Sequence, residues 1–425
     1  MDLASTRRRA VLGASVGTLL EYYDYYLFGL AAAVVFPKTF FPSSDPVASE
    51  LASFATFAVG FVLRPLGGIV LGHIADRAGR KTALIITIVS MGIATMLIGV
   101  LPGYDQIGVA APICLVLLRL VQGFATGGEM GSATSLAIEH APPDRRGLYG
   151  ALLLSGSGVA LFLSSGLMDL VSLLPDGQFR SWGWRIPFLL SVVLLVAGLV
   201  IRWKVPETPE FERARKAERP RRAPLLVVLR RPKMLVFGIL FGFANSIGGY
   251  VVTTYGTAYL TGRGVSASVA YTATMVAAGV QIVLAPTWGA LSDRIGRRPV
   301  FLGGCAALAV LIFPVFWLYN TENAVLAAVA MVLGFPVAVL AMSALSQTIL
   351  SELFGTEARA TGISMGYQFT AVLAGGFAPA ISTALVAAGG GQAWGVCLYV
   401  IGACVLSGLS MLMLPDRAGQ ELGAK

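Results

Sequence analysis

The sequence has little charge and very little histidine or cysteine. Only 12% of its 425 residues are charged, whereas 56% are hydrophobic, more apolar surface than a soluble chain could bury. The 2 histidines and 4 cysteines form no C-x-x-C pair and no metal-ligand cluster, and no nucleophile–histidine pair lies near an apolar run. Strands of about ten alternating residues are scarce, which disfavours a membrane barrel. We therefore expect an all-α membrane protein with no metal, no organic cofactor and no catalytic residues.

The formal net charge of +9 does not require a nucleic-acid partner. Of the 31 basic residues, 25 fall at the termini and in alternate connections that would share one side of a membrane. The positive-inside rule accounts for this distribution and predicts that both termini are cytoplasmic. Few of the basic residues are lysine, and alanine and glycine are abundant, which indicates a GC-rich bacterial genome. The predicted location is the bacterial plasma (inner) membrane.

Twelve apolar runs are long enough to cross a bilayer, for which about 20 residues are needed. They form two sets of six: 11–36, 47–73, 82–101, 107–139, 147–174 and 184–203, then 233–260, 267–291, 299–318, 323–351, 359–388 and 393–414. A charged, proline-bearing stretch separates the sets. The expected organisation is an N-terminal six-helix bundle (1–203), a cytoplasmic linker (204–231) and a C-terminal six-helix bundle (232–425). Twelve spans can form a pathway alone, so we expect a monomer in the lipid bilayer.

A short charged motif occurs twice. GHIADRAGRK covers Gly72–Lys81 and GALSDRIGRR covers Gly289–Arg298, each between two apolar runs, and their aspartates are 217 residues apart. A carboxylate and cations in a tight turn can clamp helix ends, because ion pairs strengthen where water is scarce. The repetition predicts a duplicated bundle with a substrate site between its halves. The predicted gate comprises Gly72, Asp76, Arg77, Gly79, Arg80, Lys81, Asp293, Arg294, Gly296, Arg297 and Arg298.

The first span contains two acidic residues, which are costly inside a membrane and indicate a functional site. In GTLLEYYDYYLFG, Glu21 and Asp24 lie three positions apart and share a helix face with Tyr25. Two carboxylates so close favour proton binding, and burial adds to this effect. The pair predicts a proton-coupling or substrate site. The alternative is that one carboxylate only pairs with a cation to lock helix packing.

Two arginines lie inside later spans of the first half. Arg64 either neutralises Asp24, holds an anionic substrate, or extends toward the cytoplasmic surface. In LRLVQGFATGGEMG, Arg119, Gln122 and Glu129 follow one stripe of a helix, where a buried arginine can bind a carboxylate through two hydrogen bonds. Arg119 and Glu129 are about 15 Å apart along this helix, so each needs partners on other helices.

The spans of the second half contain almost no charge, so its candidates are neutral polar side chains. Such groups could shape substrate specificity by hydrogen bonding, or could only join helices. The candidates are Asn245, Tyr250, Tyr255, Gln281, Tyr367 and Gln368.

These motifs carry a family resemblance. The double motif resembles the signature loop of the major facilitator superfamily, and R-x-x-Q-G in the fourth span resembles a superfamily motif associated with proton linkage. The first span, the G-G-E extension in the fourth, SWGWRIPFLLS (181–191) and PETPEF (206–211) resemble the metabolite:proton symporter family, with Tyr22 where tryptophan is usual. The pattern is most similar to the shikimate and dehydroshikimate type.

The resemblance implies twelve transmembrane helices in two pseudo-symmetric bundles and proton-driven import of a small polar organic acid, with the proton as coupling ion. It also leaves open a zwitterionic substrate such as proline or betaine. A proton-coupled exporter of a drug or endogenous metabolite is a rival interpretation, which the acidic pair and the G-G-E extension disfavour. A membrane sensor or membrane-embedded enzyme is a further alternative, disfavoured because no signalling domain or catalytic cluster is evident.

Overall fold

The computed structural model describes residues 3–78, 80–127, 141–204, 228, 232–353 and 359–415, and within these ranges every regular element is helical. The first half contains α1 (Leu3–Val34), α2 (Phe36–Thr39), α3 (Pro46–Val62), α4 (Arg64–Ala78), α5 (Arg80–Val100), α6 (Tyr104–Ile107), α7 (Ala110–Thr126), η1 (Pro143–Arg145), α9 (Arg146–Ser172), α10 (Asp176–Gln178), η2 (Phe179–Gly183) and α11 (Arg185–Lys204). The second half contains α14 (Pro232–Leu240), α15 (Phe243–Tyr250), η3 (Val251–Tyr255), α16 (Gly256–Gly262), α17 (Ala267–Ile295), α18 (Arg297–Tyr319), α19 (Ala324–Val332), η4 (Leu333–Val339), α20 (Leu340–Leu353), α21 (Arg359–Thr370), η5 (Ala371–Gly376), α22 (Ala378–Ala388) and α23 (Trp394–Met413).

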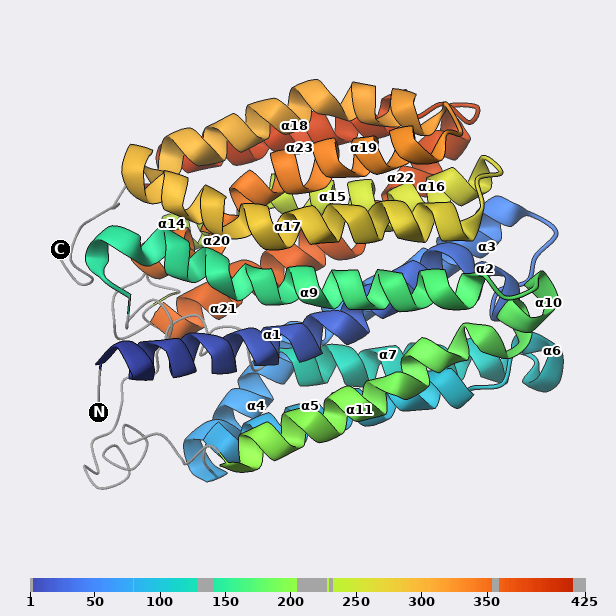
Figure 1. The fold of residues 1–425 in the computed structure, drawn as a ribbon, viewed down its shortest axis with the longest axis horizontal. Coiled ribbons are helices and arrows are strands. Elements are labelled where there is room, and N and C mark those ends of the chain that lie inside the picture. Colours follow the sequence, from blue (N-terminus) through green and yellow to red (C-terminus); the bar gives the residue numbers. More distant parts are fainter. Residues whose placement is uncertain are drawn as a thin grey trace.

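Ten helical segments of the described chain are long and apolar enough to cross a membrane. Two more helices run along the same bundle: α7, a shorter apolar helix, and α1, which has 32 residues (Figure 1). Large apolar side chains point outward, including Val310, Trp317 and Val325, each about 70% exposed. Lipid tails can cover such a surface, whereas water cannot do so without cost. The predicted all-helical, polytopic membrane fold is confirmed.

The helices of the two halves meet most extensively in two regions. In Figure 1, α9 lies beside α17, and the contacts also join α3 to α22 and η5, and α4 to α21. A shift of 217 residues, the separation of the two motif aspartates, carries the range of α3 and α4 onto α17, and that of α9 onto α21, η5 and α22. The two contact regions are therefore equivalent under the repeat that the sequence predicts.

Several predicted continuous spans are interrupted in the structure. The second span ends as α3 at Val62 and resumes as α4 at Arg64, because Pro65 in the next turn has no backbone N–H to donate. The π-helical segments η3, η4 and η5 occur in the seventh, tenth and eleventh spans. All three contribute residues to the central cavity described below. Hydropathy could locate the spans but not these local changes in helical hydrogen bonding.

Candidate functional site

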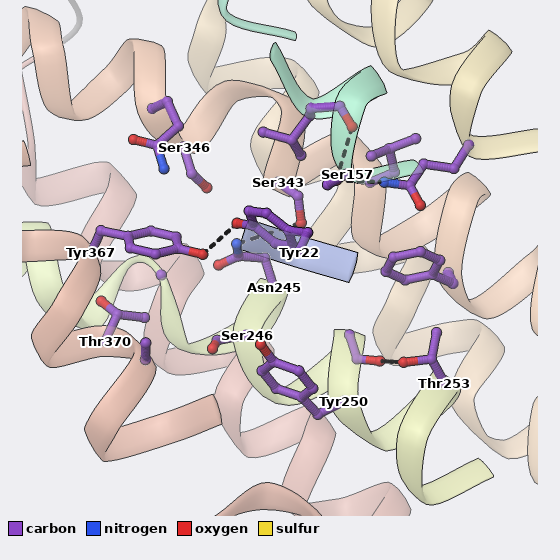
Figure 2. A pocket seen from close by; sticks show the side chains of 18 of the residues that line it. Tyr22, Ser157, Asn245, Ser246, Tyr250, Thr253, Ser343, Ser346, Tyr367 and Thr370 are labelled. Carbon is purple, nitrogen blue, oxygen red and sulfur yellow. Dashed lines mark hydrogen bonds between the residues drawn. The ribbon is translucent and has the colours of Figure 1, made fainter. Parts of the chain in front are cut away.

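A central cavity of about 100 Å³ lies between the two halves. From the first half, Tyr22 and Tyr26 of α1 and Ser157 of α9 line it; the rest of its wall comes mainly from α15, α17, α20 and α21. Figure 2 shows Tyr22 facing Tyr367 across the cavity, and their hydroxyl oxygens are 2.5 Å apart. This hydrogen bond joins the first helix to the eleventh span.

The polar side chains that line this cavity are uncharged. Hydroxyl and amide groups line it beside apolar side chains, and no acidic or basic side chain of the described residues belongs to its lining. The polar members are Tyr22, Tyr26, Ser157, Asn245, Ser246, Tyr250, Thr253, Gln281, Ser343, Ser346, Gln347, Tyr367 and Thr370. Such a surface suits a small molecule that is held by several hydrogen bonds.

The acidic pair lies beside a second, smaller pocket. Glu21 and Asp24 are each 6% exposed and line a space of about 20 Å³ against α5 and α11. Thr87 and Ser191 are its other polar members. A space of this size holds about one water molecule. The carboxylates are thus separated from the central cavity, although the tyrosines next to them on α1 line that cavity.

Arg119 is buried among aromatic rings and is 2% exposed. Its guanidinium carbon lies 4.1 Å from the ring centre of Phe28, 5.0 Å from that of Tyr25 and 5.2 Å from that of Phe57. It donates a hydrogen bond of 3.2 Å to Gln122, and its Nε and Nη2 atoms have no partner within the described chain. Cation–π attraction partly compensates for desolvation of this charge.

Arg64 also contacts the ring of Tyr25. It is 4% exposed, and its guanidinium carbon is 4.5 Å from the ring centre of Phe61 and 4.7 Å from that of Tyr25. Burial excludes the predicted alternative in which Arg64 extends to the surface. The ring of Tyr25 is in turn 5.8 Å from that of Tyr250, a lining residue. Tyr25 therefore connects the two buried arginines to the cavity wall.

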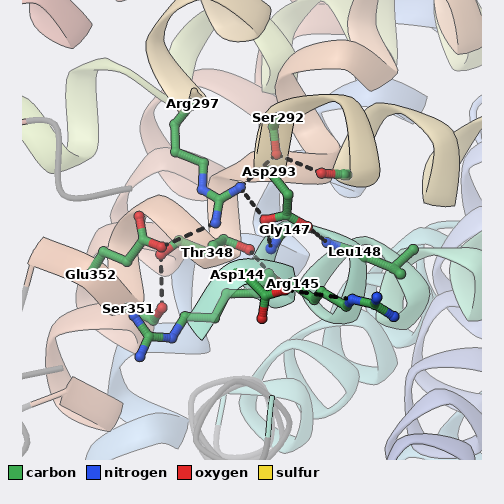
Figure 3. A network of polar contacts seen from close by, with 12 residues as sticks. Asp144, Arg145, Gly147, Leu148, Ser292, Asp293, Arg297, Thr348, Ser351 and Glu352 are labelled. Carbon is green, nitrogen blue, oxygen red and sulfur yellow. Dashed lines mark hydrogen bonds and ion pairs between the residues drawn. The ribbon is translucent and has the colours of Figure 1, made fainter. Parts of the chain in front are cut away.

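The second copy of the charged motif forms a contact between the halves (Figure 3). The carboxylate of Asp293, near the end of α17, accepts hydrogen bonds from the backbone N–H groups of Gly147 (2.8 Å) and Leu148 (2.9 Å) at the start of α9. A helix N-terminus favours such an anion. Arg297 lies 2.6 Å from Asp293 and 3.3 Å from Glu352 on α20, and all three are buried. The cluster joins four helices, α9, α17, α18 and α20.

The remaining motif residues have varied positions. Gly296 has a φ of 95°, which permits the sharp turn between α17 and α18. Arg298 donates to the backbone oxygen of Leu414 at 2.7 Å, whereas Arg294 is exposed. In the first copy, Gly72 lies within α4. Gly79 and the side chains of Asp76, Arg77, Arg80 and Lys81 lie outside the described part of the structure, as does Glu129.

Hydrogen bonds also join the halves at the opposite end of the bundle. Asp169 on α9 accepts from Ser268 (2.5 Å) and Thr272 (2.9 Å) on α17. Glu50 on α3 accepts from Thr383 on α22 at 2.7 Å. No motif in the sequence indicates these residues. An isolated acidic residue near a span end has no pattern that indicates a partner half a chain away.

The structure brings together four of the six neutral candidates of the second half: Asn245, Tyr250, Gln281 and Tyr367 line the central cavity. The other two do not. Tyr255 packs against Phe54 and Tyr259, and Gln368 donates to the backbone oxygen of Gly127 at 3.5 Å. Six further tyrosines and serines line the cavity but were not among the predicted site residues: Tyr22, Tyr26, Ser157, Ser246, Ser343 and Ser346. The tyrosine-rich EYYDYY segment was the available signal for the first two.

Comparison with known proteins supplies the remaining observations. A family model described as Major Facilitator Superfamily matches residues 14–379 and 282–424. The chain is 38% identical over 417 residues to a shikimate transporter of Escherichia coli (strain K12), which covers 97% of this chain and 95% of that protein. It is 34% identical over 399 residues to a proline/betaine transporter of the same organism, at 89% and 78% coverage. A solved proton:xylose symporter, bound to 6-bromo-6-deoxy-D-glucose, has a TM-score of 0.77 and 18% identity, with 99% and 98% coverage, and shows the shared fold.

Proposed function

The chain belongs to the Major Facilitator Superfamily, and from this membership we propose that it is a proton-coupled symporter importing a small polar organic acid, such as shikimate or a related carboxylate. As a member of this superfamily it is a multi-pass membrane transporter of small molecules and not an enzyme. The proposal concerns the coupling ion, the substrate and the direction of transport.

One feature of α1 carries the proposal. Within six residues this helix presents Glu21 and Asp24 to the small pocket, and Tyr22 and Tyr26 to the central cavity. Protonation of a buried carboxylate changes the charge in a medium of low dielectric constant, where the effect on neighbouring groups is large. A movement of α1 that accompanies proton binding would therefore displace part of the cavity wall. This coupling is what a symporter requires.

Asp24 and Arg119 interact electrostatically, so a proton that binds to Asp24 would act on Arg119 as well. When Asp24 is ionised it attracts the buried guanidinium, and when it is protonated this attraction is lost. Arg119 contacts Tyr25, whose ring contacts the lining residue Tyr250. We assign Asp24 and Glu21 to proton binding, and Arg119 and Arg64 to attracting an anionic substrate toward the adjacent cavity wall.

Alternating access would follow from relative movement of residues 1–203 and 232–425, joined by the linker 204–231. The cluster around Asp293 would close one end, and the contacts of Asp169 and Glu50 would close the other. The distribution of basic residues supports a cytoplasmic location for the Asp293 end and both termini. A bacterial helical bundle belongs in the inner membrane, because outer-membrane proteins are barrels. One chain contains the whole cavity, which supports a monomer.

Uptake into proteoliposomes tests the proposal. With an inward proton gradient, the candidates are shikimate, 2-oxoglutarate, citrate, a benzoate-type acid, proline and betaine. Accumulation of one acid that a protonophore abolishes supports symport. Export driven by the opposite gradient would instead support the drug or metabolite exporter, and accumulation of proline or betaine alone would support a zwitterion symporter.

Neutralising Asp24 gives the sharper test of its role. Asp24→Asn keeps the shape of the side chain but cannot bind and release a proton, so we expect accumulation to fall by about tenfold or more, which corresponds to roughly 1.4 kcal/mol. Glu322→Gln, the same type of change at an exposed loop residue, should leave accumulation unchanged. If Asp24→Asn still concentrates substrate against a gradient, Asp24 is not the coupling group.

A further inference from the structure

Three amide side chains on the second-half wall of the cavity have unused hydrogen-bond acceptors. They are Asn245 on α15, Gln281 on α17 and Gln347 on α20. The side-chain oxygen of each is buried and has no partner within the described chain. Gln281 and Gln347 are 1% and 3% exposed. A buried acceptor without a donor is unfavourable, so these oxygens indicate donors that the protein itself does not supply.

Two of the amides are oriented by serines. The hydroxyl of Ser157 donates to the backbone oxygen of Leu154 at 2.8 Å, so it can only accept from Gln281, whose nitrogen lies 3.1 Å away. Ser343 donates to the backbone oxygen of Val339 at 3.2 Å and accepts from the Asn245 nitrogen at 3.4 Å. Each amide nitrogen therefore faces its serine, and each amide oxygen is left for another donor.

The same cavity also contains hydrogen-bond donors. Tyr22, Tyr250 and Tyr367 line it, and the ring of Tyr25, which lies 4.7 Å from the Arg64 guanidinium carbon, is 5.8 Å from that of Tyr250. A carboxylate would be favoured near these tyrosines, where phenolic hydroxyls and the nearby cation can stabilise it. The cavity thus combines unused acceptors, which suit hydroxyl groups, with donors near a buried cation, which suit a carboxylate.

We propose that Asn245, Gln281 and Gln347 determine specificity by accepting hydrogen bonds from hydroxyl groups of the substrate. The substrate is a compact acid that carries at least two hydroxyl groups. A quaternary ammonium zwitterion such as betaine has no donor and leaves all three acceptors unpaired. This inference rests on the proposed function, since it assigns a substrate class to the same cavity.

The test compares ligands that differ only in their hydroxyl groups. Binding of shikimate, quinate, cyclohex-1-ene-1-carboxylate and betaine to the purified full-length chain is measured by ligand-induced thermal shift, and uptake is measured in proteoliposomes. Sites built to bind a hydroxyl reject analogues that lack it, so we expect cyclohexene carboxylate to bind at least about tenfold more weakly than shikimate or quinate. Equal or tighter binding of cyclohexene carboxylate or betaine, or no binding of either hydroxylated acid, overturns the proposal.

Variants assign the preference to the amides. Gln281→Met and Asn245→Leu keep the approximate size of each side chain but remove the acceptor, and should reduce the preference for shikimate over cyclohexene carboxylate by about tenfold. Binding of cyclohexene carboxylate should persist, which shows that the variants fold. Gln392→Met, the same change at an exposed position, should preserve the preference. An unchanged preference in both cavity variants overturns the assignment.

The two proposals fail differently. If hydroxylated acids bind with the expected preference but a protonophore does not affect their uptake, the specificity assignment stands and proton coupling fails. If uptake is proton-driven but the variants keep the wild-type preference, symport stands and the assignment to the amides fails.

Discussion

At the scale of single residues, the unusual feature is a buried arginine that stacks on aromatic rings. We predict that Arg119→Lys lowers proton-driven accumulation by about tenfold or more, since a compact ammonium cannot reproduce stacking contacts that are each worth about 1–2 kcal/mol when desolvated. The measurement is uptake at saturating substrate under a fixed proton gradient. Arg180→Lys, at an exposed residue, is the matched control. Wild-type accumulation in Arg119→Lys would show that positive charge alone suffices at this position.

The sequence identified the charged residues of the site but not their surroundings. Glu21, Asp24 and Arg119 could be identified because a charge inside a span is rarely tolerated without a function. Helical periodicity gives the face of one helix and not the neighbour that this face contacts. For this reason the separation of the acidic pair from the cavity, and the aromatic partners of Arg119, required the structure.

At the scale of helices, packing between α4 and α7 depends on glycine. A β-carbon at Gly67 would collide with the backbone oxygen of Phe124. Gly67→Ala should therefore destabilise the protein by about 1–3 kcal/mol, the usual cost of overpacking. The midpoint of thermal unfolding in detergent measures this effect. Gly303→Ala is the control, because a β-carbon there has no neighbour within 4 Å in the described structure. Equal midpoints for the two variants would contradict the proposed close packing.

The helices themselves were largely predictable, and their interruptions were not. Hydropathy over about 20 residues decides whether a segment enters the bilayer, and this average is visible in the sequence. The π-helical turns of η3, η4 and η5 depend on which backbone oxygen each N–H reaches, which packing against neighbouring helices determines. They adjoin the cavity, so the least predictable backbone lies close to the proposed substrate.

At the scale of the whole molecule, the two halves are joined at both ends, by Asp293 at one end and by Asp169 at the other. Hydrogen bonds to a carboxylate contribute about 1.5–3 kcal/mol each. A ligand or mutation shifts a conformational equilibrium only by its difference in interaction between the states. Weakening either contact should therefore favour opening at that end.

We predict opposite effects of Asp293→Asn and Asp169→Asn on access to the cavity. Each amide keeps the side-chain shape but weakens its contacts, so the open population at its own end should rise by about tenfold, or roughly 1.4 kcal/mol. The probe is a cysteine at the lining position Ser346, in a chain without its four native cysteines, labelled by an impermeant maleimide from either side of oriented proteoliposomes. Asp293→Asn should accelerate labelling from the side of the charged motif, and Asp169→Asn should accelerate it from the other side. Asp176→Asn, at an exposed residue, should change neither rate. Acceleration from the same side in both variants would contradict the assignment of the two contacts to alternate gates.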